Sequence, residues 1–112
     1  MAVSSPRFAS QLVAPGEEPR FFDDLGCLAA YLRDHASLPP GAAAYVADHR
    51  SGEWVPPSAA VFTSVPGLET PMGSHVVAHA SASSRDADPA SQHGTPVEPR
   101  AFFGRPLPEG AR

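Results

Sequence analysis

The segment FFDDLGCLAAYLRD, residues 21–34, carries the clearest helix pattern in the chain and decides how the rest is interpreted. Four apolar residues within it recur at offsets of 0, 3, 4 and 7, which places them on one face of a helix. They are Leu25, Leu28, Ala29 and Leu32. Asp23 or Asp24 can cap the first turn, and the breaker cluster at 38–41 lies beyond the last. The pattern therefore predicts a helix that runs to about Asp34.

Extended segments are predicted on both sides of this helix. Residues 8–13 and 19–22 are separated by the turn-forming stretch 14–18, so they predict a β-hairpin. After the helix, residues 42–48 predict a strand. A turn and a second short extended segment, 53–55, follow it.

The remainder repeats this alternation less clearly. Strands are predicted at 61–64 and 75–79, and a helix is predicted within 81–92, where Pro89 must lie in the first turn or break it. Residues 96–103 predict an edge strand. Residues 104–112 predict a loose tail.

These elements predict an α+β fold in one small domain. One strand-strand-helix-strand pattern ends near Asp48, and a second is expected between Trp54 and Phe103, which gives two similar halves. The domain is assigned to residues 1–103, with 104–112 as a flexible tail. A chain of 112 residues can bury only about two-thirds of its unfolded surface, so one modest core is expected. With 14 prolines and 9 glycines, the elements should be short.

The charge pattern argues against several classes of partner. The chain has 8 basic residues against 12 acidic ones, and all the basic residues are arginines scattered singly along the sequence. Nucleic-acid binding normally requires clustered basic residues, and anionic membrane surfaces attract the same clusters. No stretch approaches the ~20 apolar residues that span a bilayer, and no apolar export segment follows Met1. We therefore expect a soluble protein that binds no nucleic acid.

No catalytic template is present. Cys27 is the only cysteine, it excludes an internal disulfide, and no nucleophile signature surrounds it. The glycines are isolated and form no phosphate-binding loop, and no zinc-binding spacing occurs. We therefore predict that the protein is not an enzyme.

Soft-metal ligands offer a different kind of chemistry. Thioether, thiolate and imidazole groups suit Cu(I), and the chain has three sulfur side chains, those of Met1, Cys27 and Met72. Met72 lies between Pro71 and Gly73 in a predicted turn, a context that favours presentation to a ligand. The alternative is that Met72 fills the core, as methionines often do.

Nearby histidines and the cysteine each have two interpretations. His75 could reach a metal at Met72 if the turn folds back, or it could be an ordinary strand residue. His79 lies roughly 13 Å further along an extended strand, so it cannot share an ion with His75 and is better explained as a satisfied, partly buried side chain. Cys27 lies off the leucine stripe, near Tyr31, and is either a ligand or a small buried residue.

Five short motifs also occur in a recognisable order. They are Phe21-Phe22-Asp23-Asp24, Tyr45-Val46-Ala47-Asp48, Trp54-Val55, Thr70-Pro71-Met72-Gly73 and His93-Gly94. In this order, and above all through Pro-Met-Gly, they resemble the NosL family, whose members are copper-binding accessory proteins of nitrous oxide reductase assembly. The similarity runs from Met1 to about Phe103.

The resemblance implies two similar α+β halves, Cu(I) bound partly by Met72, and delivery of copper to an apoenzyme or its assembly machinery. Family proteins are typically exported and lipid-anchored, which implies a periplasmic location, with membrane contact only through an anchor preceding Met1. The family also carries Cys-x-x-Cys-Gly-Met before its first strand. This sequence begins Met1-Ala2-Val3 and matches only the methionine of that motif. The resemblance thus implies a metal site that includes Met72, with Met1 as a further candidate. Without an N-terminal thiolate, Met72 with Cys27 or His75 would make a weaker site, because neutral thioethers stabilise Cu(I) less than thiolates do.

Two explanations are open for the missing cysteines. Either the start codon has been assigned at an internal methionine, which we favour, or the chain is a shortened homologue without the thiolate. A non-metal-binding scaffold or interaction module derived from the same fold is the alternative function. A third hypothesis, an enzyme resembling organomercurial lyase, rests on analogy of fold alone and would need paired thiolates, which Cys27 cannot supply.

Overall fold

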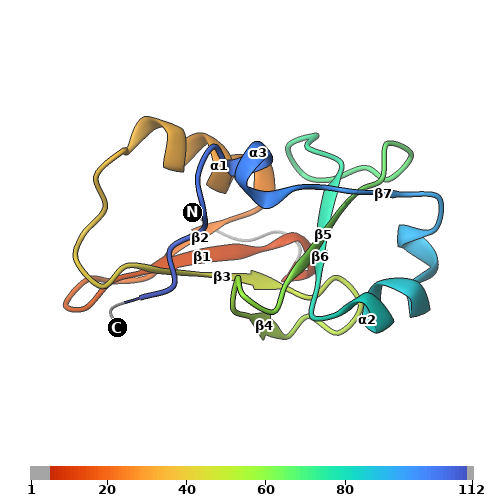
Figure 1. Ribbon diagram of the computed structural model, residues 1–112, viewed down its shortest axis with the longest axis horizontal. Helices are drawn as coiled ribbons and strands as arrows, with labels where there is room; N and C mark the ends of the chain where they lie inside the picture. The colour runs from red at the N-terminus through yellow and green to blue at the C-terminus, as the bar shows by residue number, and fades with distance from the viewer. Residues whose placement is uncertain (1–5, 111–112) are drawn as a thin grey trace.

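The computed structural model describes residues 6–110, which begin with a first sheet and its helix (Figure 1). A short 3₁₀ turn, η1 (Pro6–Phe8), leads into the hairpin β1 (Ser10–Val13) and β2 (Arg20–Phe22). Helix α1 (Leu25–Asp34) follows, then β3 (Ala43–Ala47) and β4 (Trp54–Val55). All neighbours pair antiparallel in the order β2-β1-β3-β4. The predicted hairpin, helix and strands of this region are confirmed.

The second sheet follows the same plan. Strands β5 (Val61–Ser64) and β6 (Val76–His79) pair antiparallel, helix α2 (Ala82–Ala87) and the 3₁₀ turn η2 (Pro89–Ser91) follow, and β7 (Thr95–Pro96) returns beside β5. The order β6-β5-β7 matches β2-β1-β3 of the first sheet. Two strand-strand-helix-strand halves are therefore present. The second begins at Val61 and not at Trp54, because β4 pairs with β3.

The two halves share one hydrophobic core. Helix α1 and the short helix α3 (Pro99–Phe103) lie side by side above the first sheet (Figure 1), and the four apolar residues of the predicted stripe are all buried. From the second sheet, Phe62, Val76 and Ala78 join the same core. Phe62 meets Phe103 edge-on, with ring centroids 5.4 Å apart. Because both sheets contribute side chains to this one core, the two halves form a single domain.

Two expectations for the C-terminal part are wrong. The predicted edge strand 96–103 contains only the end of β7, since residues 99–103 form α3, which Glu98 caps by accepting from the Arg100 N–H. The segment expected to be a loose tail is attached as far as Gly110. Its Leu107 is buried, and Pro108 accepts a backbone hydrogen bond from Ala44.

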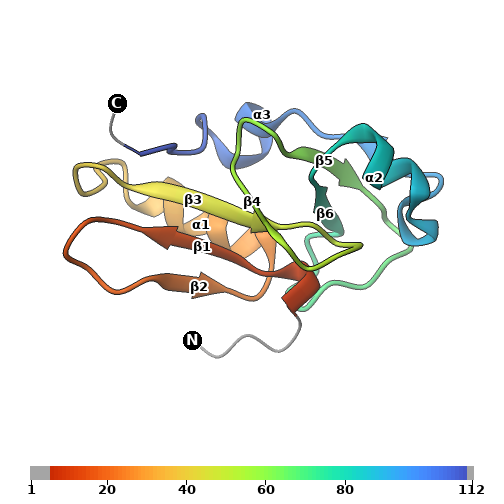
Figure 2. The same cartoon turned by 90° about the horizontal axis from the view of Figure 1, so that it is seen from below.

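The sheets meet where β3 ends. Asp48 forms a parallel bridge with Ala78, and the His49 N–H donates to the Ala78 carbonyl at 2.8 Å. Seen from below, the turn after β3 lies between the first sheet and the helix α2 (Figure 2). This junction ties the first half to the second at Ala78, at the edge of the shared core.

Candidate metal-binding loop

Met72 lies at the tip of the loop that joins β5 to β6. The loop is closed at its base by the Val65 N–H, which donates to the His75 carbonyl at 2.7 Å. A turn at its tip is closed from the Gly73 N–H to the Thr70 carbonyl, and Gly73 adopts φ +77°, a conformation that glycine tolerates best. The Met72 side chain is 70% exposed. The core-filling alternative for Met72 is therefore wrong.

Asp24 holds this loop in place from the other half of the molecule. One oxygen of its buried carboxylate accepts the Gly26 N–H at 2.9 Å and so caps α1. The other oxygen accepts the Met72 N–H at 2.8 Å and the Thr70 hydroxyl. The loop that carries Met72 is thus fixed to the start of α1 by a single side chain. Of the two aspartates predicted to cap this helix, Asp24 is the one that does so.

The environment keeps the Asp24 carboxylate ionised. Burial alone would raise the pKa of Asp24, but hydrogen bonds from Ser74, Thr70, Gly26 and Met72 outweigh this effect and lower the pKa below its ordinary value. The N-terminus of a helix carries partial positive charge, which disfavours a nearby cation. An ionised Asp24 offsets that charge close to the Met72 loop.

His75 lies at the end of the loop, and one of its ring nitrogens is held by a hydrogen bond. Its backbone adopts φ +61°, and the strand expected over 75–79 begins one residue later, at Val76. The His75 Nδ1 lies 2.9 Å from the Leu68 carbonyl, which can accept only from a protonated Nδ1. This tautomer leaves the Nε2 lone pair available, the arrangement in which imidazoles usually bind metals.

Cys27 is anchored beside this loop, but its thiol lies elsewhere. Its N–H donates to the Asp24 carbonyl, whereas its half-buried side chain lines an open cleft of about 590 Å³ between β2 and α1, together with Phe22 and Tyr31. Burial, followed by the charges of Asp24 and Asp23, raises the pKa of the Cys27 thiol. The thiol form predominates at neutral pH, so Cys27 is a poorer Cu(I) ligand than a thiolate.

The four predicted ligands are therefore brought together only in part. Met72 and His75 share one loop, Cys27 faces a separate cleft, and Met1 lies outside the described residues. Within residues 6–110, no group of three or more His, Cys, Asp or Glu side chains is placed to hold a metal ion. Any site at this loop thus depends on the sulfur of Met72.

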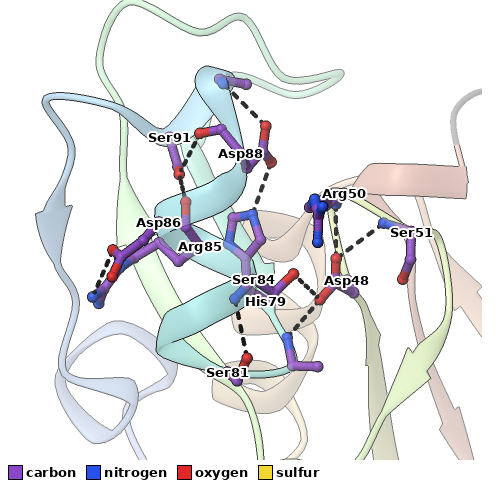
Figure 3. A network of polar contacts seen from close by, with 12 residues as sticks. Asp48, Arg50, Ser51, His79, Ser81, Ser84, Arg85, Asp86, Asp88 and Ser91 are labelled. Carbon is purple, nitrogen blue, oxygen red and sulfur yellow. Dashed lines mark hydrogen bonds and ion pairs between the residues drawn. The ribbon is translucent and has the colours of Figure 1, made fainter.

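A second polar network, absent from the sequence-based predictions, surrounds Asp48 and His79 (Figure 3). Asp48 accepts from the Ala80 N–H at 2.7 Å and from the Ser84 hydroxyl at 2.8 Å, so it holds the start of α2. His79 is completely buried, and its Nε2 lies 2.8 Å from Asp88. The nearest sequence signal for this network was Asp48 at the end of a predicted strand, but nothing local linked it to Ser84.

Comparison with protein-family models, with curated proteins and with solved structures finds no match to this chain. Between residues 6 and 110 the longest helix is the ten-residue α1, and no helix has the length and apolarity required to cross a bilayer.

Proposed function

We propose that this protein is a Cu(I)-binding accessory protein that carries copper on Met72 and passes it to a partner. The observation that supports this most directly is the exposure of the Met72 thioether on a loop fixed by Asp24. A thioether is a soft, neutral ligand that suits Cu(I). Because it projects from the surface, a partner's ligands could approach the same ion and displace it.

The proposed donor set is Met72 with the Nε2 of His75. The two residues lie close in sequence on the same loop. The hydrogen bond to the Leu68 carbonyl fixes the His75 tautomer in which Nε2 has a free lone pair. Met1 is proposed as a third ligand by its resemblance to the methionine of the NosL motif. Copper is the cargo of this site, and its proposed recipient is the apoenzyme of a reductase such as nitrous oxide reductase, or its assembly machinery, in the periplasm.

A scaffold or interaction module without metal binding is the competing proposal. One observation favours it: Cys27, the only thiol in the sequence, faces a cleft separate from the Met72 side chain's loop and has a raised pKa. A site with neutral ligands alone would hold Cu(I) less tightly than one with a thiolate. This proposal expects no measurable Cu(I) affinity, even after upstream cysteines are added to the chain.

Anaerobic titration with Cu(I) against a chromogenic chelator distinguishes the two proposals. We expect stoichiometric competition by the parent chain and a loss of affinity of about tenfold or more in Met72→Leu, which keeps the shape of the side chain but removes its sulfur. Val97→Ala, a substitution outside the loop, is the control and should bind as the parent does. Equal binding by Met72→Leu and the parent would exclude Met72 as a ligand.

A further inference from the structure

Two buried histidines lie against each other at the junction of the sheets. His49 is 7% exposed and His79 is fully buried. Their ring centroids are 6.2 Å apart and the rings meet edge-on. Among the described residues, the Nδ1 atom of each ring has no hydrogen-bond partner. A proton placed on either of these nitrogens would therefore enter an environment with no acceptor for it.

The cluster holds fewer negative charges than a doubly protonated pair would need. Asp88 pairs with the Nε2 of His79 at 2.8 Å and also accepts the Ala90 N–H at 3.0 Å. A charge on His79 would thus be matched by Asp88. The charge of Asp88 also raises the pKa of His49, so the same carboxylate would have to balance a proton on either ring, and a second proton would be unmatched.

The remaining groups around His49 do not supply the missing charge. In η1, a hydrogen bond to the Arg7 backbone raises the pKa of His49, whereas the Arg7 guanidinium charge lowers it. The Phe8 ring packs on the imidazole, with ring centroids 4.9 Å apart. The neighbouring Asp48 is ionised, but its carboxylate is occupied by donors from Arg50, Ser51, Ala80 and Ser84. The His49 imidazole is therefore enclosed by an aromatic ring, a cation and a second imidazole.

His49 also lies where the two sheets and η1 come together. The His49 N–H donates to the Ala78 carbonyl of β6, and the Ala47 N–H donates to the Ala9 carbonyl, next to η1, at 3.0 Å. The first sheet, the second sheet and η1 meet at this residue. Expulsion of the ring would break its contact with Phe8 and weaken the link between the two sheets.

We propose that His49, packed against His79, is an acid-sensitive latch that joins the two halves and η1 while its imidazole is neutral, and opens when this imidazole takes up a proton. Opening moves the His49 imidazole into water, where its charge is hydrated. The segment before β1 is then released from the turn that follows β3. The latch does not depend on the proposed copper function, because neither histidine belongs to the Met72 loop.

The direction of the effect follows from linkage. Burial lowers the pKa of His49 from its ordinary value of 6.5, and Asp88 offsets this only partly. Because the open state then binds more protons than the closed state, the closed state loses stability as the pH falls below about 6.5. One additional proton in the open state means an opening equilibrium that grows about tenfold per pH unit in this window.

Amide hydrogen exchange and histidine NMR together test the latch in the full chain. We expect the protection factors of the His49 and Ala47 amides, corrected for intrinsic rates, to fall about tenfold per pH unit between about pH 6 and pH 5. The amide of Leu32 in α1 should keep its protection. The midpoint of the loss should coincide with the titration of the His49 ring, followed by its Cε1 resonance.

Substitution separates the latch from general acid sensitivity. In His49→Gln, which cannot gain the charge, protection at residue 47 should not change over the same pH range. His35→Gln, at an exposed histidine, should behave as the parent does. Constant protection in the parent, a loss that does not follow the His49 resonance, or an equal loss in a folded His49→Gln would each overturn the proposal. If His49→Gln does not fold, the coincidence of the two midpoints in the parent decides.

Discussion

A single carboxylate, that of Asp24, stabilises both a helix and the loop of the proposed site. Its oxygens accept from Gly26 at the start of α1 and from Met72 and Thr70 across the molecule. The sequence predicted the cap, because an aspartate before an apolar stripe is a local pattern. The bonds to the loop could not be predicted, since they join residues 48 and 46 positions apart.

Asp24→Ala should therefore destabilise the protein and loosen the loop together. Losing a helix cap and leaving buried donors unpaired costs about 1–3 kcal/mol in the free energy of unfolding. Urea denaturation measures this cost, and exchange of the Met72 amide measures the mobility of the loop. Glu17→Gln, on an exposed turn, is the control and should change neither. A destabilised variant whose Met72 amide stays protected would show that Asp24 acts on the helix alone.

The buried carboxylate of Asp48 should make the free energy of unfolding depend on pH. Burial would raise its pKa, but hydrogen bonds from Ala80, Ser84, Ser51 and Arg50 outweigh this and lower the pKa to about 2. Since the ordinary value is 3.8, the stabilisation is complete above pH 3.8 and is lost as the pH falls toward 2. The effect is on the order of 2 kcal/mol.

Urea unfolding of the parent and of Asp48→Asn, at about pH 5 and about pH 2.5, measures this contribution. The amide cannot ionise, so the difference in stability between the two pH values should be smaller in the variant by that amount. The same difference in both proteins would mean that other carboxylates account for the acid sensitivity.

At the scale of elements, the strand β7 depends on a close approach at Gly94. A Cβ atom there would lie 2.5 Å from the Thr63 Cγ2 and 2.9 Å from the Ser64 carbonyl oxygen on β5. Gly94→Ala should therefore push β7 away from β5 and cost about 1–3 kcal/mol. Gly67→Ala, where a Cβ would meet nothing within 4 Å, should have little effect. Thermal unfolding of both variants measures the contrast, and equal midpoints would contradict it.

The elements differ in how well the sequence predicts them. Helix α1 was predicted because its buried stripe is long and regular, and the first hairpin because a clear turn separates its strands. Helix α3 was mistaken for a strand, since its five residues are too few to show a period and its Phe102 and Phe103 also suit a strand. Glu98 before Pro99, with Gly104 after Phe103, was the signal that could have identified it.

At the scale of the whole molecule, the C-terminal segment closes the domain. Leu107 is buried in the shared core, and Gly110 donates a backbone hydrogen bond to Ala42 at 2.9 Å. The sequence suggested a loose tail because prolines, glycines and charges dominate this segment, and one leucine gives no periodic pattern. Its attachment depends on a partner strand that lies more than 60 residues earlier in the chain.

Leu107→Ala should thus lower the free energy of unfolding by about 2–4 kcal/mol, because it leaves a cavity in the shared core. Guanidinium denaturation provides the measurement. Pro106→Ala, the neighbouring exposed position, is the control. A Leu107→Ala protein as stable as the parent would show that this segment does not stabilise the domain.

The two halves have the same strand order but unlike surroundings. Helix α1 of the first half contributes four buried side chains to the core, whereas α2 of the second half contributes none. If the halves descend from one duplicated unit, selection acts on them unequally. We expect natural variants to differ freely in the sequence of α2 and little in that of α1. Sequence similarity between the halves would then be lost, and the repeat would be recognisable only in the path of the backbone.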